Sequence, residues 1–142
     1  MALLGVTAGG LAPAVDGIRL SLHVLAAAVW VGGQITLAGL VPTARGIGPE
    51  APKALARAFG RVQWPAFVVL LATGVWNMSA VSKGQPHAWQ VLVGVKVAVV
   101  LLAGAAAYLH TRSTSKAGLA AWGAVSSLTS LAALVMGVFL AG

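Results

Sequence analysis

The feature that most constrains this chain is a set of four long apolar stretches that carry almost no charge. They cover residues 20–44, 62–82, 97–111 and 117–142. A helix needs about 20 predominantly apolar residues to cross the hydrocarbon core of a membrane, which is about 30 Å thick. Three of the stretches have this length, and the remaining one reaches it if its helix begins near Trp89 and includes Lys96. The sequence therefore predicts four transmembrane helices.

The charge content agrees with a membrane protein. Only 8% of the residues are charged and 59% are hydrophobic, whereas a soluble domain has about a quarter charged residues. Because every connection between the stretches is short, we expect an all-α integral membrane protein, an antiparallel four-helix bundle in one domain over residues 1–142. Pro42 is expected to end the first helix. The predicted transmembrane helices are 16–41, 62–80, 88–110 and 117–141, and a short amphipathic cytoplasmic helix is expected at 52–61.

The basic residues indicate how the helices are oriented. Arg19 and Lys83 lie on the side of the chain termini, and six others lie in the connections after the first and third helices. The six are Arg45, Lys53, Arg57, Arg61, Arg112 and Lys116. Short cytoplasmic loops carry an excess of Lys and Arg, so both termini are expected on the outer side. This distribution also explains the net charge of +7 without a nucleic-acid partner.

Most polar side chains inside the predicted spans fall near the outer side of the membrane. His23 lies about 6 to 10 Å into the first span, and Lys96 lies at a similar depth in the third. Asn77 reaches this depth because the second helix runs in the opposite direction. A lysine inside the bilayer costs about 2.5–3.5 kcal/mol on insertion scales, so Lys96 is expected to have a partner inside the bundle. Asp16, His23 and Trp30 repeat every seven residues on one face.

The residue types in this cluster suit a metal or a haem. Imidazole binds haem iron and copper, and a thioether binds Cu(I). His23, Met78 and His87 together would form a soft-metal site that opens outward. Alternatively, His23 would be the axial ligand of haem b, with a nearby cation to hold a propionate. The propionate, anion or proton partners would then be Lys96 and Asn77, and the pocket walls Trp30 and Trp76.

Each candidate also has a structural interpretation. The structural roles are hydrogen bonding between helices for His23 and Asn77, extension to the outer interface for Lys96, packing for Met78 and Trp30, and solvation for His87. His110 is a further candidate at the inner interface beside Arg112. There a structural role or contact with lipid headgroups is expected.

Hydrolytic and thiol chemistry are not expected. The chain has no cysteine, which excludes disulfides, thiolate metal sites and thiol catalysis. Its two acidic residues, Asp16 and Glu50, lie on opposite sides of the predicted membrane. No nucleophile is paired with a base in a recognisable motif. We therefore assign no catalytic residue.

Three segments resemble a known family. The segment LHVLAAAVWVGGQITL resembles the first helix of the copper resistance protein D (CopD) membrane domain, with its Leu-His, small apolar run and Trp-x-Gly-Gly. The similarity continues in FGRVQWPAFVVLLATGVWN and WQVLVGVKVAVVLLAGAAAYLHTR, and so covers about residues 18–112. The last helix matches only in hydropathy. The resemblance implies a role in copper uptake or tolerance at the bacterial inner (plasma) membrane.

The chain is also similar to the HemJ-type protoporphyrinogen oxidases, which are short four-helix membrane proteins that bind haem. The roles of their first-helix histidine and third-helix lysine would carry over to His23 and Lys96. After Trp30 that family has a further aromatic, basic and histidine-containing stretch, whereas this chain has GGQITLAGLVP. The departure favours the copper-resistance side of the resemblance.

Three functions remain open on the sequence. The first is a CopD-like protein that handles copper or haem at the outer cluster, and the second is a HemJ-like haem-binding oxidoreductase. The third is a non-catalytic small subunit of a larger membrane complex. The expected partners are the lipid bilayer and either further copies of the chain or the subunits of that complex. The two ligand hypotheses predict that the His23→Ala variant loses a bound ligand. The third hypothesis predicts that this variant has the same composition as the wild-type protein.

Overall fold

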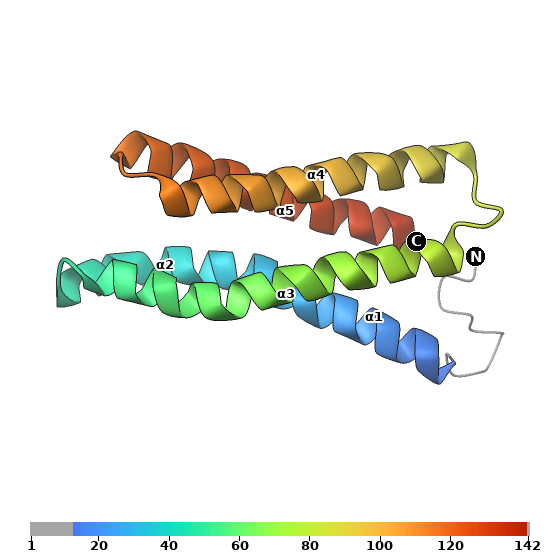
Figure 1. Cartoon of the computed structure of the whole chain (residues 1–142), viewed down its shortest axis with the longest axis horizontal. Helices are drawn as coiled ribbons and strands as arrows, with labels where there is room; N and C mark the ends of the chain where they lie inside the picture. Colours follow the sequence, from blue (N-terminus) through green and yellow to red (C-terminus); the bar gives the residue numbers. More distant parts are fainter. Residues whose placement is uncertain (1–12, 142) are drawn as a thin grey trace. The chain divides into compact units, whose positions relative to one another are not determined.

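The computed structural model describes residues 13–141, and within that range every regular element is a helix. Four helices are long and apolar enough to cross a membrane, Ala14–Ile47, Ala51–Val81, His87–Arg112 and Lys116–Ala141 (Figure 1). The prediction of an all-α chain with four helices of membrane-spanning length is confirmed. The chain divides into two compact units, of which one ends at Met78 and the other begins at Ser79.

The first long helix has three parts. α1 (Ala14–Ala27) is followed by a π-helical turn, η1 (Ala28–Gly32), and then by α2 (Gly33–Ile47). The predicted end at Pro42 is corrected, because α2 continues through this residue. A proline removes one backbone hydrogen bond, which a membrane helix tolerates. The helix ends instead before Gly48 and Pro49, since the residue before a proline avoids the helical conformation.

The second long helix, α3 (Ala51–Val81), is continuous. The amphipathic helix predicted at 52–61 forms the first turns of α3, so the predicted start of the second transmembrane helix at residue 62 is corrected. Pro65 lies inside α3 and does not end it.

In the first unit α3 runs antiparallel to α1 and α2. The contact partners show this, because residue numbers fall along α3 as they rise along the first helix. The pairs are Arg19 with Asn77, His23 with Thr73, Trp30 with Phe67 and Trp64, and Gly33 with Phe59. The first unit is therefore a helical hairpin whose two long helices contact each other through polar and aromatic side chains.

The centre of this hairpin is aromatic. Trp30 is 2% exposed, and its ring centroid lies 4.3 Å from that of Phe67 and 5.7 Å from that of Trp64. Further along the same helix, a Cβ at Gly33 would collide with the ring of Phe59. A glycine is thus required at position 33 for this aromatic ring to lie against α2.

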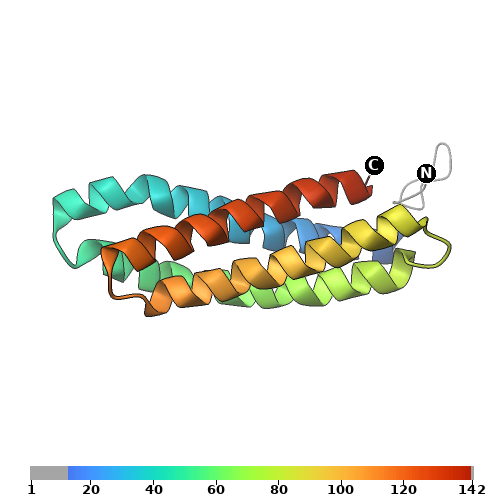
Figure 2. The same cartoon turned by 90° about the horizontal axis from the view of Figure 1, so that it is seen from above.

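The second unit contains α4 (His87–Arg112) and α5 (Lys116–Ala141), which lie side by side in both views (Figure 1 and Figure 2). Their buried residues are all small and are Ala103, Gly104, Ala106, Ala107, Ser126, Ser130 and Ala133. Ser126 Oγ donates a hydrogen bond to the carbonyl oxygen of Ala103 at 3.1 Å. Small residues let two membrane helices approach closely, and this explains the packing of α4 on α5.

Candidate functional site

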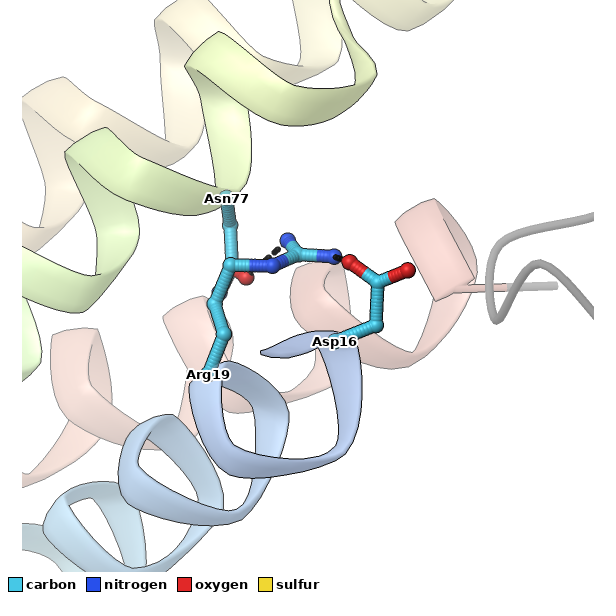
Figure 3. A network of polar contacts seen from close by, with 3 residues as sticks. All are labelled: Asp16, Arg19 and Asn77. Carbon is cyan, nitrogen blue, oxygen red and sulfur yellow. Dashed lines mark hydrogen bonds and ion pairs between the residues drawn. The ribbon is translucent and has the colours of Figure 1, made fainter. Parts of the chain in front are cut away.

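Three polar side chains connect the start of α1 to the end of α3 (Figure 3). Arg19 donates from Nη2 to Oδ1 of Asp16 at 2.9 Å and from Nη1 to Oδ1 of Asn77. We call these three residues the arginine network. Arg19 is 2% exposed, whereas the side chain of Asp16 is 31% exposed. The network therefore buries a guanidinium and leaves its counter-ion partly accessible.

The arginine network satisfies most of what a buried guanidinium requires, namely a counter-charge and hydrogen-bond acceptors. Asp16 supplies the charge from three residues earlier, in the first turn of α1, where the helix dipole favours an acid. Asn77 supplies an acceptor from α3. Arg19 Nε, however, is buried and has no acceptor among the described residues. The Nε–H of the guanidinium is thus a buried donor without a partner among these residues.

Arg19 is counted in the sequence analysis as a basic residue on the outer side of the membrane and is not predicted to belong to the site. It lies in α1 with a buried side chain. A sequence signal for this exists, because Asp16, Arg19, His23, Ala26 and Trp30 follow one another at intervals of three and four residues. Such spacing places them on one helix face. Arg19, His23 and Trp30 all contact α3 from that face.

The imidazole of His23 is oriented by α3. Its Nδ1 lies 2.8 Å from Oγ1 of Thr73, and that hydroxyl lies 2.7 Å from the carbonyl oxygen of Val69 and 3.2 Å from that of Leu70. A hydroxyl has one proton to donate, and both carbonyl oxygens can only accept it. Thr73 therefore accepts the hydrogen bond that His23 donates from Nδ1.

With the hydroxyl proton of Thr73 on the carbonyl oxygen of Val69, Nδ1 of His23 carries the ring proton. A neutral imidazole carries its proton on one nitrogen only, so the lone pair is on Nε2. Gly74 lies beside the same ring, and a Cβ at this position would be 3.7 Å from Cε1 of His23. The ring is half-buried. His23 thus has the protonation pattern of a histidine that ligates a metal through Nε2.

The other candidates of the first unit lie near the same helix ends or in the core. Met78 is half-buried and Trp76 is 42% exposed, and the two flank Asn77 in α3. Trp30 is enclosed by aromatic rings, so in this unit it packs the core. Among residues 13–141, no three His, Asp or Glu side chains gather where they could hold a metal ion.

The second unit holds the remaining candidates. Lys96 is directed at α5, because a Cβ at Gly137 would be 2.9 Å from its Nζ, and its ammonium has no hydrogen-bond or ion-pair partner within residues 13–141. His87 is exposed at the first residue of α4. His110 donates from Nδ1 to the carbonyl oxygen of Leu119 at 2.8 Å. This bond ties the end of α4 to α5.

The donor set of the first unit fits haem better than a copper ion. The porphyrin supplies most of the ligands of haem iron, so one oriented imidazole is enough from the protein. A copper ion draws its ligands from several side chains, and of the predicted copper ligands the first unit contains only His23 and Met78. The unpaired Nε of Arg19 is also a donor that an acidic substituent of a ligand could use.

Comparison of the chain with protein-family models, with curated proteins and with solved structures finds no match.

Proposed function

We propose that this chain is a multi-pass membrane protein that binds haem, and that Nε2 of His23 would hold the haem iron. The observation that supports the proposal is the hydrogen bond from His23 Nδ1 to Thr73. Histidines that ligate metals donate the other ring N–H to a fixed acceptor, which sets the tautomer and the ring orientation. Thr73 is such an acceptor, because its own proton is directed to the backbone of α3.

The family resemblance adds to the proposal the kind of membrane in which the protein would lie. The similarity to the CopD and HemJ families would place the protein in a bacterial inner membrane, and the excess of basic residues in two loops would place both termini outside. Between the two families, the single oriented imidazole favours haem over a copper ion. The departure after Trp30 favours the copper-resistance family. We therefore propose a haem-binding protein that is similar to these two families, and we do not assign it the oxidase activity of the HemJ-type proteins.

The residues of the first unit would have distinct tasks. His23 would bind the iron, and Thr73 would keep the ring in place and in the required tautomer. Bound haem supplies one-electron chemistry whose potential depends on the axial ligand and its hydrogen bonds. No acid, base or nucleophile of the chain is assigned to a reaction, so the proposal is binding and not a catalytic cycle.

The test is a visible absorption spectrum with metal analysis on protein purified in detergent, with haem and copper offered in separate samples. Wild-type protein is expected to show a Soret band, His23→Ala is expected to lose it, and Thr73→Val is expected to retain weaker binding. The matched control is His110→Ala, because this histidine is bonded to the backbone carbonyl of Leu119. The control should keep the band.

Two results would contradict the proposal. Copper bound without a Soret band and lost in His23→Ala would replace haem with a copper site. Wild-type protein that binds neither haem nor copper would leave the third hypothesis, a non-catalytic subunit, in which His23 and Thr73 only connect two helices.

A further inference from the structure

We propose that Arg19 binds a carboxylate side chain, or acidic arm, of the ligand that His23 holds. In the absence of the ligand, the carboxylate of Asp16 pairs with the guanidinium, and the acidic arm displaces it on binding. The inference rests on the proposed function and deepens it. It names the chemical class of the ligand, an iron porphyrin whose carboxylate side chain is free.

The first argument is the unfilled edge of the guanidinium. Arg19 uses Nη1 and Nη2 for Asn77 and Asp16, while Nε is buried without an acceptor in the described residues. Buried donors are almost always paired in native structures, and leaving one unpaired is costly. Guanidinium groups bind carboxylates through two parallel N–H bonds. A carboxylate that approaches the Nε side would fill the vacant donor.

The second argument is the position of Arg19 relative to His23. The two residues are four apart in α1, and both contact α3 from the same face. Four residues are one turn, a rise of about 6 Å. A ligand centred on His23 with a carboxylate at its rim can therefore reach the guanidinium along the helix. A bare metal ion has no such arm.

The third argument is the difference between the two partners of Arg19. Asp16 has a partly exposed side chain in the first turn of α1, so it can turn towards water while the helix dipole still stabilises its charge. Asn77 comes from α3 and would hold Nη1 in place during the exchange. The buried guanidinium would then have one carboxylate partner both before and after the ligand binds.

The experiment compares haem b with its dimethyl ester, in which both carboxylates are masked, by absorption titration of the purified protein in detergent. Wild-type protein should bind haem b about 10- to 100-fold more tightly than the ester, the range of one or two charge-assisted hydrogen bonds. Arg19→Gln should bring the affinity for haem b close to that for the ester. Asp16→Asn removes the competing anion and should tighten haem b binding without tightening the ester.

Two variants address the risk that Arg19→Gln impairs folding. Arg19→Lys keeps the positive charge but has no Nε–H edge, and it should lower the preference for haem b with an unchanged helical circular dichroism spectrum. Arg57→Gln is the matched control, because this arginine is exposed in α3 and away from the arginine network. Its preference for haem b should equal that of the wild-type protein.

The outcomes separate the inference from the proposed function. If the wild-type protein and the Arg19 variants bind both porphyrins equally and His23→Ala binds neither, Arg19 does not hold the carboxylate, although the haem proposal stands. If Lys96→Gln, and not an Arg19 variant, removes the preference, the carboxylate belongs to Lys96 and the inference is wrong. If the wild-type protein binds neither porphyrin, the proposed function fails and the inference fails with it.

Discussion

The protein has two helical hairpins, and the helices within each hairpin contact each other through different kinds of side chains. In the first, large side chains mediate the contact, with an aromatic cluster around Trp30 and polar pairs that involve Arg19 and His23. In the second, the buried residues of α4 and α5 are alanines, a glycine and serines. In lipid, where the hydrophobic effect does not drive helices together, close backbone packing is the usual solution. The first hairpin does not use close backbone packing, and the polar side chains at its contact include His23 and Arg19, which are proposed to bind the ligand.

The largest expected effect comes from the aromatic cluster. Trp30→Ala should lower the free energy of unfolding by about 3–5 kcal/mol, because it empties a fully buried site between Trp64 and Phe67. Trp122→Ala in the second hairpin should cost about 1–2 kcal/mol, since that side chain is only half-buried. Titration of the folded protein with a denaturing detergent, followed by far-ultraviolet circular dichroism, measures both. Equal losses would remove the contrast between the hairpins.

The next effect concerns the small-residue interface. Ala106 is 0% exposed, and Ala106→Leu should lower the free energy of unfolding by about 1–3 kcal/mol because added volume pushes α4 from α5. Its neighbour Ala105 is exposed, so Ala105→Leu should leave this free energy nearly unchanged. The same denaturation experiment compares the two variants. A similar result for both would show that close backbone approach does not hold the second hairpin together.

A smaller effect is expected for the polar pairs. Thr73 and Thr129 each bond a carbonyl oxygen four residues earlier in their own helix, but only Thr73 also accepts from His23. Thr73→Val should cost about 0.6–1.7 kcal/mol in unfolding free energy, the range of hydrogen bonds between membrane helices. Thr129→Val should cost less. If the order is reversed, the bond to His23 contributes little to the stability of the first hairpin.

The smallest effect should come from the exposed ion pair of Glu50 and Lys53. Their charged atoms are 3.4 Å apart and both side chains are 72% exposed. Solvent screening leaves such a pair with about 0–1 kcal/mol, so Glu50→Gln should hardly change the melting temperature. Asp16→Asn in the apo protein should lower it clearly, because Arg19 would lose the counter-ion of a buried charge. Equal shifts would show that the arginine network behaves as a surface pair.

The sequence was sufficient to predict the four long helices, because apolar length and the near absence of charge determine them. It was not sufficient for their ends, because Pro42 does not end the first helix and the second helix begins well before residue 62. The burial of Arg19 is not predicted from the sequence either. A charge at the end of an apolar stretch is expected near the membrane surface, and only a pairing with Asp16 and a partner on α3 makes its burial possible.

The partner of His23 could not be predicted either. A hydrogen bond between two helices depends on their rotation and register, and a threonine in an apolar helix is not by itself distinctive. The small residues of α4 and α5 were easier to interpret, since any close pairing of membrane helices needs them. Their sequence pattern predicts a contact without specifying which residues meet.

The π-helical turn has a consequence for how this chain tolerates insertions and deletions. A turn of this kind holds one residue more than the α-helical turn it replaces, and here it separates the part of the helix with Arg19 and His23 from α2. Deletion of one residue from 28–32 would restore a regular α-helix without a gap in its hydrogen bonds. Because the turn absorbs its extra residue locally, the parts before and after it would keep their rotation relative to each other, and the faces that α1 and α2 direct at α3 would not change. A one-residue deletion in a regular part of the same helix would instead rotate every residue beyond it by about 100°. The π-helical turn is therefore the one place in this helix where the loss of a single residue should leave the site intact.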